Sequence, residues 1–176
     1  MSKFWQNFRY SLPLHFVLLL TNWLPDNIVF IRLRGTLCRP FFMSCGKNLR
    51  LGRNLTFYNP SKIFIGNNVY IALGCWFQGG EAIRIHDETI FGPYVVVVTA
   101  NHSLAGGSYH AGPPVDVAPV VIGAGSWIAA HSTILPGSCL EKGSLIAANS
   151  VFKGSTTPGG VYGGVPARKL KEIELN

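Results

Sequence analysis

The feature that most constrains this chain is a six-residue repeat in its C-terminal half. From Ile122 onward the sequence reads IGAGSW, IAAHST, ILPGSC, LEKGSL, IAANSV and FKGSTT. The first position of each hexapeptide is large and apolar, and the fifth position is always Ser or Thr. Because a fixed period of this kind marks stacked structural units, it outweighs local helix or strand propensity.

One large apolar residue in every hexapeptide predicts a short strand followed by a turn in each repeat. Three repeats then close a triangular coil of roughly 18 residues, in which each large side chain points inward. Equivalent positions should stack one coil apart, in these pairs: Ile122 with Leu140, Ile128 with Ile146, and Ile134 with Phe152. The predicted fold class is all-β, a parallel β-helix whose backbone hydrogen bonds run between coils.

The same phase recurs upstream of the main repeat and is then interrupted. Large apolar residues are six apart from Ile65 to Phe77 and again from Ile85 to Val97. After Val97 the phase is lost until the main repeat begins, and residues 103–119 are rich in glycine and proline. This composition predicts a loop that protrudes from the β-helix.

Both ends of such a β-helix need a cover, since bare coils expose unpaired backbone groups. We expect residues 1–53 to form an apolar segment of short helices over one end, and residues 54–165 to form the β-helix with its loop. Residues 166–176, which read PARKLKEIELN, are predicted to form a short helix over the other end.

The net charge of +7 is confined to the N-terminal segment. Residues 1–53 contain eight Lys and Arg residues against one acid, Asp26, whereas residues 54–176 are electrically balanced. A nucleic-acid partner would need basic residues on the body of the protein, so this class of function is excluded.

The N-terminal segment is also the most apolar part of the chain. Proline and polar residues interrupt Leu12–Ile31, so this run is too broken to cross a bilayer. Phe4, Trp5 and Phe8 share one helical face, and aromatic residues beside arginines suit a helix that lies in a membrane interface. The alternative is that these helices only cap the core. We therefore expect a cytoplasmic protein, with the inner membrane surface as one candidate partner.

The four cysteines, Cys38, Cys45, Cys75 and Cys139, have neither CxxC spacing nor the spacing of a zinc module. This pattern predicts reduced, mostly buried thiols, as is usual in the cytoplasm.

The repeats of the form [LIV]-G-x-x-x-x and the closing GGVPARKLKEI resemble the hexapeptide-repeat acyltransferases over about residues 60–174. Thr99-Ala-Asn-His102, at a coil corner before the loop, resembles the maltose, galactoside and nodulation O-acetyltransferase branch. The resemblance implies a left-handed β-helix and a homotrimer. It also implies acetyl-CoA as the co-substrate, held in the groove between neighbouring subunits, and direct transfer of the acetyl group.

Carried over residue by residue, the resemblance makes His102 the general base, since an imidazole is the natural proton acceptor near neutral pH. The candidate acetyl-CoA contacts are Trp127, Ala130, Ala148, Lys153, Arg168 and Lys171. Candidate acceptor contacts are Asn101 and, in the loop, His110. Coil arithmetic places Ala82, next to Glu81, at the corner one coil before that of His102, so we hypothesise that Glu81 is a catalytic partner that orients the imidazole or stabilises its charged form.

The resulting prediction is an acetyl-CoA-dependent O-acetyltransferase that acts on a sugar hydroxyl in cell-surface polysaccharide biosynthesis. Ala72 and Gly80 stand where galactoside-type enzymes have Asn and Asp, so the acceptor should differ from theirs. The alternatives are N-acetylation of a nucleotide-linked amino sugar and acetylation of another small molecule. Two further alternatives are a non-catalytic scaffold and a zinc enzyme of the β-helix type. The zinc alternative would use histidines among His86, His102, His110 and His131.

Overall fold

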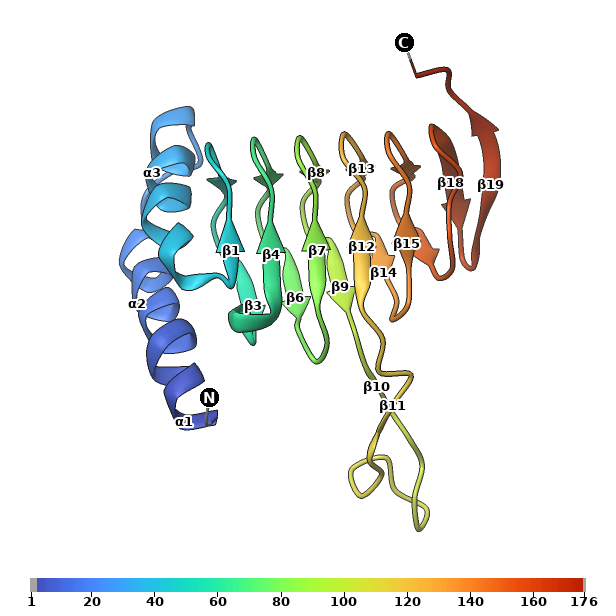
Figure 1. The fold of residues 1–176 in the computed structure, drawn as a ribbon, viewed down its shortest axis with the longest axis horizontal. Helices are drawn as coiled ribbons and strands as arrows, with labels where there is room; N and C mark the ends of the chain where they lie inside the picture. The colour runs from blue at the N-terminus through green and yellow to red at the C-terminus, as the bar shows by residue number, and fades with distance from the viewer. Residues whose placement is uncertain (1–2, 176) are drawn as a thin grey trace.

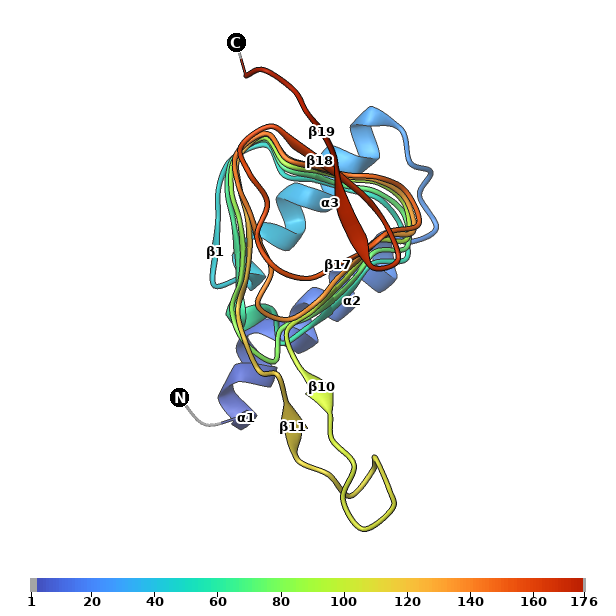
Figure 2. The same cartoon turned by 90° about the vertical axis from the view of Figure 1, so that its right-hand side faces the viewer.

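The computed structural model describes residues 3–175, and a parallel β-helix forms the body of the molecule (Figure 1). Viewed along its axis, the β-helix has a triangular cross-section with three flat faces (Figure 2). Helices cover its N-terminal end, two antiparallel strands close its C-terminal end, and an arm of chain leaves its middle. The parallel β-helix predicted from the hexapeptide repeat is confirmed.

Each of the three faces is one sheet of short strands. The first face holds β1 (Ser44–Cys45), β4 (Ile63–Ile65), β7 (Ile83–Ile85), β12 (Val120–Ile122) and β15 (Cys139–Leu140). The second holds β2 (Arg50–Leu51), β5 (Tyr70–Ile71), β8 (Ile90–Phe91), β13 (Trp127–Ile128), β16 (Leu145–Ile146), β18 (Gly160–Gly164) and β19 (Ala167–Glu172). The third holds β3 (Thr56–Tyr58), β6 (Trp76–Gln78), β9 (Val96–Val98), β14 (Thr133–Ile134) and β17 (Val151–Phe152).

The register between coils matches the arithmetic of the repeat. The three predicted pairs are strand partners: Ile122 with Leu140, Ile128 with Ile146, and Ile134 with Phe152. All of these side chains are buried, and they continue as columns into the upstream coils. Burial of these columns is the main stabilising contribution, at about 25 cal/mol per Å² of apolar surface.

The serines of the fifth position occupy the corners. Ser126, Ser132, Ser138, Ser144 and Ser150 are at most 1% exposed. Their hydroxyl groups bond to backbone carbonyl oxygens; for example, Ser132 Oγ donates to the carbonyl of Ala147 at 2.8 Å. The position is restricted to Ser or Thr because the side chain must be small and must pair a buried polar group.

The β-helix begins earlier than predicted. Cys45 pairs with Ile65 and Leu51 with Ile71, so the first coil starts at β1 rather than at residue 54. Cys45, Leu51 and Phe57 keep the spacing of six, and a two-residue insertion follows before Ile65. The predicted boundary is wrong because Cys45 is a small residue and the insertion hid the phase.

Within residues 3–175, the helical elements are six short segments: α1 (Lys3–Gln6), the π-helix η1 (Asn7–Ser11), α2 (Leu12–Thr21), α3 (Ile28–Cys38), and the 3₁₀ turns η2 (Arg39–Phe41) and η3 (Pro60–Lys62). The first five cover the N-terminal end of the β-helix, as predicted (Figure 1). Leu14 and Cys38 join the hydrophobic core of the first coils. At Gly35 only glycine fits, because a Cβ would lie 1.9 Å from the carbonyl oxygen of Leu49.

A buried arginine fixes this cap to the solenoid. Arg34 in α3 is fully buried and donates to the carbonyl oxygens of Leu51 at 2.6 Å, Thr21 at 3.0 Å and Leu24 at 3.1 Å. Its charge is balanced by Asp26 at 3.2 Å. Part of the basic N-terminal charge therefore has a structural role.

The C-terminal segment is a strand, and the predicted C-terminal helix is wrong. Strand β18 pairs in parallel with β16, and β19 folds back on β18 as an antiparallel partner. The reason is that β18 would otherwise present an open edge, which the last residues satisfy by pairing. An isolated helix of about ten residues would be marginal in water, so the tertiary hydrogen bonds decide the conformation.

No helix within residues 3–175 is long and apolar enough to cross a bilayer.

Candidate active site

The predicted loop forms an arm built on a two-stranded ribbon. Strand β10 (Asn101–His102) pairs antiparallel with β11 (Pro114–Val115), so that His102 lies opposite Pro114. At the base of the arm, buried Thr99 donates to the carbonyl oxygen of Gln78 at 2.7 Å and accepts from the backbone N–H of Glu81 at 2.8 Å. The arm is thus anchored to the preceding coil, and the side chain of His102 is exposed on it.

A polar pocket of about 610 Å³ lies beside this arm. Its lining combines the N-terminal helices, the insertion after Phe57, Gly80 and the arm: Gln6, Asn7, Ser11, Phe57, Tyr58, Asn59, Lys62, Gly80 and Pro114. Pro114 is the strand partner of His102, so the predicted base stands next to the pocket wall. We call this the arm pocket.

Glu81 lies near the base of the arm, but its carboxylate is engaged elsewhere. Lys62 Nζ is 3.2 Å from the Glu81 carboxylate and also donates to the carbonyl of Gly80. Within the described chain, no hydrogen bond joins Glu81 to His102. The structure therefore places Glu81 on the rim of the arm pocket through Lys62, and its action on the imidazole stays a prediction.

The two predicted acceptor contacts lie at opposite ends of the arm. Asn101 donates to the carboxylate of Asp116 at 3.3 Å, and Lys153 pairs with the same carboxylate at 3.4 Å. Lys153 therefore ties the base of the arm to the last coil, in addition to its predicted contact with acetyl-CoA. His110 is exposed at the outer end of the arm.

Most of the remaining predicted cofactor residues gather on the second face and its corner. Ala130 and Ala148 occupy the same corner in successive coils, where the N–H of Asn149 donates to the carbonyl of Ala130 at 3.0 Å. Trp127, Leu145, Val161 and Lys171 are successive strand partners across the second face. Arg168 is exposed opposite Gly163 on the same sheet.

The exposed groups of this face are of the kinds that could hold acetyl-CoA. Trp127 is 48% exposed and offers an aromatic surface for the pantetheine arm. Arg168 and Lys171 are exposed cations, which suit phosphate oxygens. Backbone groups in the corner turns of Ala130 and Ala148 can bond the amides of pantetheine.

Two ring residues stack at the same corner, of which the sequence analysis named His131 only for the zinc alternative and did not single out Tyr94. Tyr94 and His131 stack with ring centroids 5.0 Å apart and an interplanar angle of 18°. Both have a left-handed backbone, with φ of 58° and 59°. Each stands three residues after an inward apolar residue, Phe91 or Ile128, and this common phase was the signal in the sequence. Lys62 was missed because it lies in the insertion, outside the repeat.

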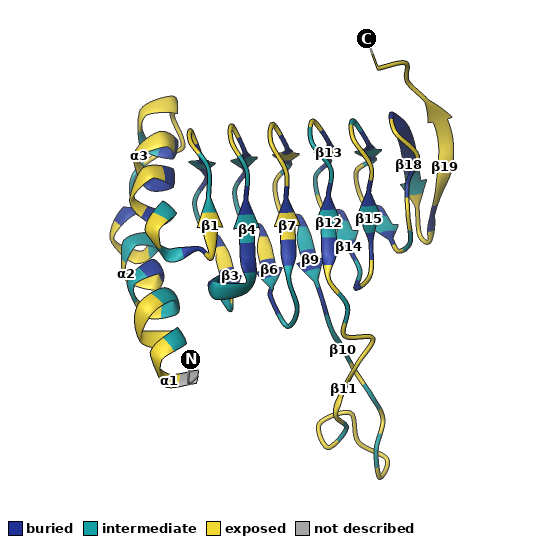
Figure 3. Ribbon diagram, in the orientation of Figure 1, coloured by how far each residue is buried: buried dark blue, intermediate teal, exposed yellow. Residues whose placement is uncertain are grey.

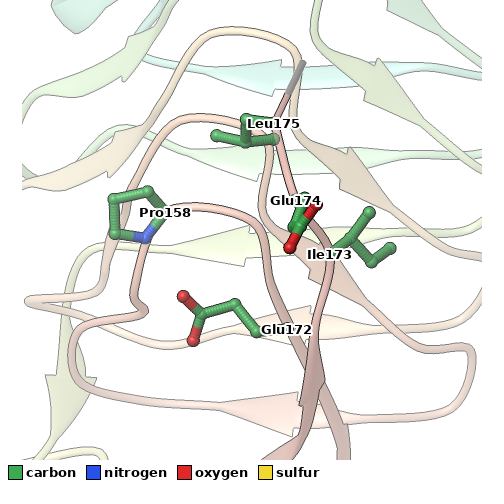
Figure 4. Close-up of a pocket in the computed structure, with 5 residues that line it drawn as sticks. All are labelled: Pro158, Glu172, Ile173, Glu174 and Leu175. Atoms are coloured by element: carbon green, nitrogen blue, oxygen red, sulfur yellow. The ribbon is translucent and has the colours of Figure 1, made fainter.

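A second concavity, of about 500 Å³, lies at the C-terminal end and is lined by Pro158, Glu172, Ile173, Glu174 and Leu175 (Figure 4). Its carboxylates would repel the phosphates of acetyl-CoA. In residues 3–175, moreover, no three His, Cys, Asp or Glu side chains are placed to hold a metal ion. The histidines of the zinc alternative thus form no cluster.

No family model matches the chain. It is 28% identical to galactoside O-acetyltransferase of Escherichia coli K12 over 80% of this chain and 68% of that protein. It is 29% identical to a protein of the same organism named as a lipopolysaccharide biosynthesis O-acetyl transferase, over 69% of this chain and 66% of the relative. The chain thus spans about two thirds of the length of these relatives.

Solved structures agree with these relatives. A galactoside acetyltransferase in complex with coenzyme A superposes with a TM-score of 0.83 at 25% identity, covering 99% of this chain and 84% of that one. A hexapeptide-repeat acetyltransferase of Vibrio cholerae with bound acetyl-CoA gives 0.82 at 25% identity, with coverage of 98% and 91%.

The fold, the repeat and these relatives define the class: a left-handed β-helix acetyltransferase of the hexapeptide-repeat type. The predictions of an acyltransferase and of acetyl-CoA as its co-substrate are confirmed at the level of this class. More particularly, the chain resembles the galactoside and maltose O-acetyltransferase branch, as predicted from the repeat and from the segment around His102.

Proposed function

We propose that the protein transfers the acetyl group of acetyl-CoA to a sugar hydroxyl during assembly of a cell-surface polysaccharide. The observation that carries the proposal is the position of His102, which is held on an anchored arm beside a polar pocket. Relatives named as O-acetyltransferases, one of them for lipopolysaccharide biosynthesis, support the same assignment. This role belongs in the cytoplasm, at the inner face of the cell membrane.

In the proposed reaction His102 acts as general base. The imidazole accepts the proton of the sugar hydroxyl while the hydroxyl oxygen attacks the thioester carbonyl. A carbon–oxygen bond forms, the carbon–sulfur bond then breaks, and the proton passes from the imidazole to the leaving sulfur. The side chain of His102 is exposed on the arm, so an acceptor can approach its imidazole from solvent.

The arm pocket is the proposed acceptor site. Tyr58, Asn59 and Lys62 offer hydrogen-bonding groups for sugar hydroxyls. Asn101 at the base of the arm and His110 at its outer end are proposed as further contacts of a longer acceptor. A volume of about 610 Å³ accommodates more than one sugar ring. This size agrees with an oligosaccharide or polymer acceptor rather than a small galactoside.

We further propose that the active unit is a homotrimer, with acetyl-CoA between neighbouring subunits. On the second face, Ile90 is 42% and Trp127 is 48% exposed in the single chain. Such an apolar row is typical of a surface that is covered on assembly or by a ligand. Sedimentation equilibrium measures the molecular mass in solution, which should be that of three chains. The mass of a single chain at micromolar concentration would contradict the trimer.

The test of the function is acetyl-CoA consumption with candidate glycans. We expect His102→Ala to lower kcat by about 10²–10⁴-fold, in the range of general-base catalysis. His86→Ala is the matched control, because His86 is also an exposed histidine but lies away from the arm. Release of the product's acetyl group by mild base distinguishes an ester from the amide of the N-acetyl alternative. Full activity in His102→Ala would refute the proposed base.

A further inference from the structure

The N-terminal helices carry apolar side chains on two opposite faces. One face packs on the solenoid: Leu14 is buried, and Val17 and Leu18 contact the core. The other face is exposed and follows helical spacing along Lys3–Thr21 and just beyond: Phe4, Phe8, Leu12, Phe16, Leu19, Leu20 and Trp23. A helix that is apolar all round is normally covered on all sides.

Helix α3 extends this exposed surface. Ile28 is 51%, Val29 64%, Leu33 41% and Leu37 43% exposed. These residues belong to the helices that close the end of the β-helix, and Figure 3 shows the exposed segments of α2 and α3 in yellow. We call this surface the end face. It is far larger than the scattered apolar residues of an ordinary surface.

The positive charge around the end face favours an anionic partner. Arg9 and Arg32 are exposed near it. The only acid in residues 1–53, Asp26, is paired with both Arg34 and Arg53. An apolar surface bordered by cations and without a free carboxylate complements an anionic lipid bilayer. A second copy of the same face would instead bring like charges together.

An apolar groove connects the end face with the arm pocket. The groove has a volume of about 440 Å³ and is lined by Phe4, Asn7, Phe8, Ser11, Leu12 and His15. Asn7 and Ser11 also line the arm pocket. An apolar space and a polar space therefore meet along one short wall. In both ribbon views the start of α1 and the arm project toward the same side of the β-helix (Figures 1 and 2).

From these observations we infer that the end face lies on an anionic bilayer and that the acceptor is a glycan joined to a lipid of that bilayer. The lipid remains with the membrane and the apolar groove, while the sugar part occupies the arm pocket beside His102. The lipid-linked acceptor rests on the proposed acetyltransferase function. The binding of the end face to the bilayer does not.

The binding test uses the full-length protein and sedimentation with vesicles of phosphatidylglycerol and phosphatidylcholine. We expect the wild type to bind, and Leu20→Ser combined with Trp23→Ser to bind at least tenfold more weakly, since two large side chains no longer leave water. The control is Leu170→Ser combined with Ile173→Ser at the opposite end, which are also exposed apolar residues. This control should bind as the wild type does.

Equal vesicle binding by the wild type and the Leu20/Trp23 variant would overturn the docking surface. So would absence of binding at low salt, or a larger assembly of copies that the Leu20/Trp23 substitutions dissolve. Circular dichroism verifies that both variants keep the fold, which is expected because all four side chains are exposed.

The acceptor test compares one glycan in two forms, either joined to a lipid in vesicles or free in solution. The Leu20/Trp23 variant should lose at least tenfold in rate on the lipid-linked form and keep its rate on the free form. Equal rates on both forms would overturn the lipid-linked acceptor. Vesicle binding without acetyl transfer to any glycan would refute the proposed function while leaving the docking surface intact.

Discussion

Single residues at the corners of this β-helix adopt a left-handed backbone. One corner holds Asn48 at φ 56°, Asn68 at 57° and Glu88 at 60°, followed by Gly125 and Gly143 at 68°. Asparagine and glycine tolerate this conformation, whereas a glutamate in it costs on the order of 1 kcal/mol. The amide of Asn48 also donates to Asn68 at 3.0 Å, which begins a ladder that Glu88 continues only weakly, at 3.4 Å.

We expect Glu88→Asn to raise the free energy of unfolding by about 0.5–1 kcal/mol, because it relieves the left-handed strain and extends the amide ladder. Urea denaturation measures the change. Glu88→Ala is the control, since alanine keeps the strain and loses the hydrogen bond. A gain of the same size with alanine would contradict the explanation.

Three cysteine thiols should make the stability of the fold depend on pH. Burial is the main reason that the pKa of Cys38 is raised to about 12 and that of Cys45 and Cys75 to about 11. The folded state keeps these protons while the unfolded chain releases them above about pH 9, so the unfolded state binds fewer protons. Stability should therefore fall as the pH rises from about 9 toward 11 or 12.

Urea denaturation between pH 8 and 10.5 measures how the free energy of unfolding changes with pH. In the Cys75→Ala variant, this free energy should fall less steeply as the pH rises. All four cysteines are free, and at pH 8 we expect a thiol reagent to modify Cys139 first, the partly exposed Cys45 more slowly because of its raised pKa, and the buried Cys38 and Cys75 only after unfolding. Rapid labelling of Cys38 in the folded protein would contradict its burial.

At the scale of elements, the helical cap depends on one buried cation. Arg34 and Arg53 both pair with Asp26, but Arg34 is fully buried and the Arg53 side chain is 41% exposed. Arg34 alone also satisfies the carbonyls of Thr21, Leu24 and Leu51. The two arginines therefore form a matched comparison.

We expect Arg34→Ala to lower the free energy of unfolding by about 3–5 kcal/mol, because it removes the buried partner of Asp26 and leaves three carbonyl groups without their side-chain donor. Arg53→Ala should lower the free energy of unfolding by less than about 1 kcal/mol, as is usual for exposed ion pairs. Chemical denaturation followed by circular dichroism distinguishes the two. Equal losses of unfolding free energy in the two variants would show that Arg34 does not fix the N-terminal helices to the β-helix.

At the scale of the whole molecule, the β-helix is almost one-dimensional, and only its ends need covering. The helices α1 to α3 close the first coil and β19 closes the last one. The columns of inward apolar residues make each coil depend on its neighbours. The proposed acceptor site lies where this regularity is broken, at the arm and at the insertion that carries Lys62.

Removal of residues 167–176 should expose the edge of β18 and cause association that increases with protein concentration. Size-exclusion chromatography over a concentration series measures this. Light scattering during urea titration is an independent check. An unchanged elution volume at all concentrations would show that β19 is not needed as a cover.

Much of the fold follows from local spacing, but the ends and the site do not. The register of Ile122 with Leu140 could be predicted because the period is an intrinsic property of the sequence. The helix predicted after Pro166 was wrong because its strand depends on the edge offered by β18. The position of Glu81 beside Lys62 could not be predicted, because insertions in two different coils bring them together.

The sequence by itself determined the β-helix, its coil length, the arm, the class of enzyme and the confinement of the charge to residues 1–53. The β-helix, its coil length, the arm and the charge distribution are properties of the repeat and the composition, which each local segment expresses alone, whereas the class of enzyme followed from the resemblance to a known family. Only the tertiary structure decided which faces the helices leave exposed, that Arg34 is buried, and that a groove and the arm pocket share Asn7 and Ser11. Those features depend on segments that are distant in sequence, and only packing brings such segments into contact.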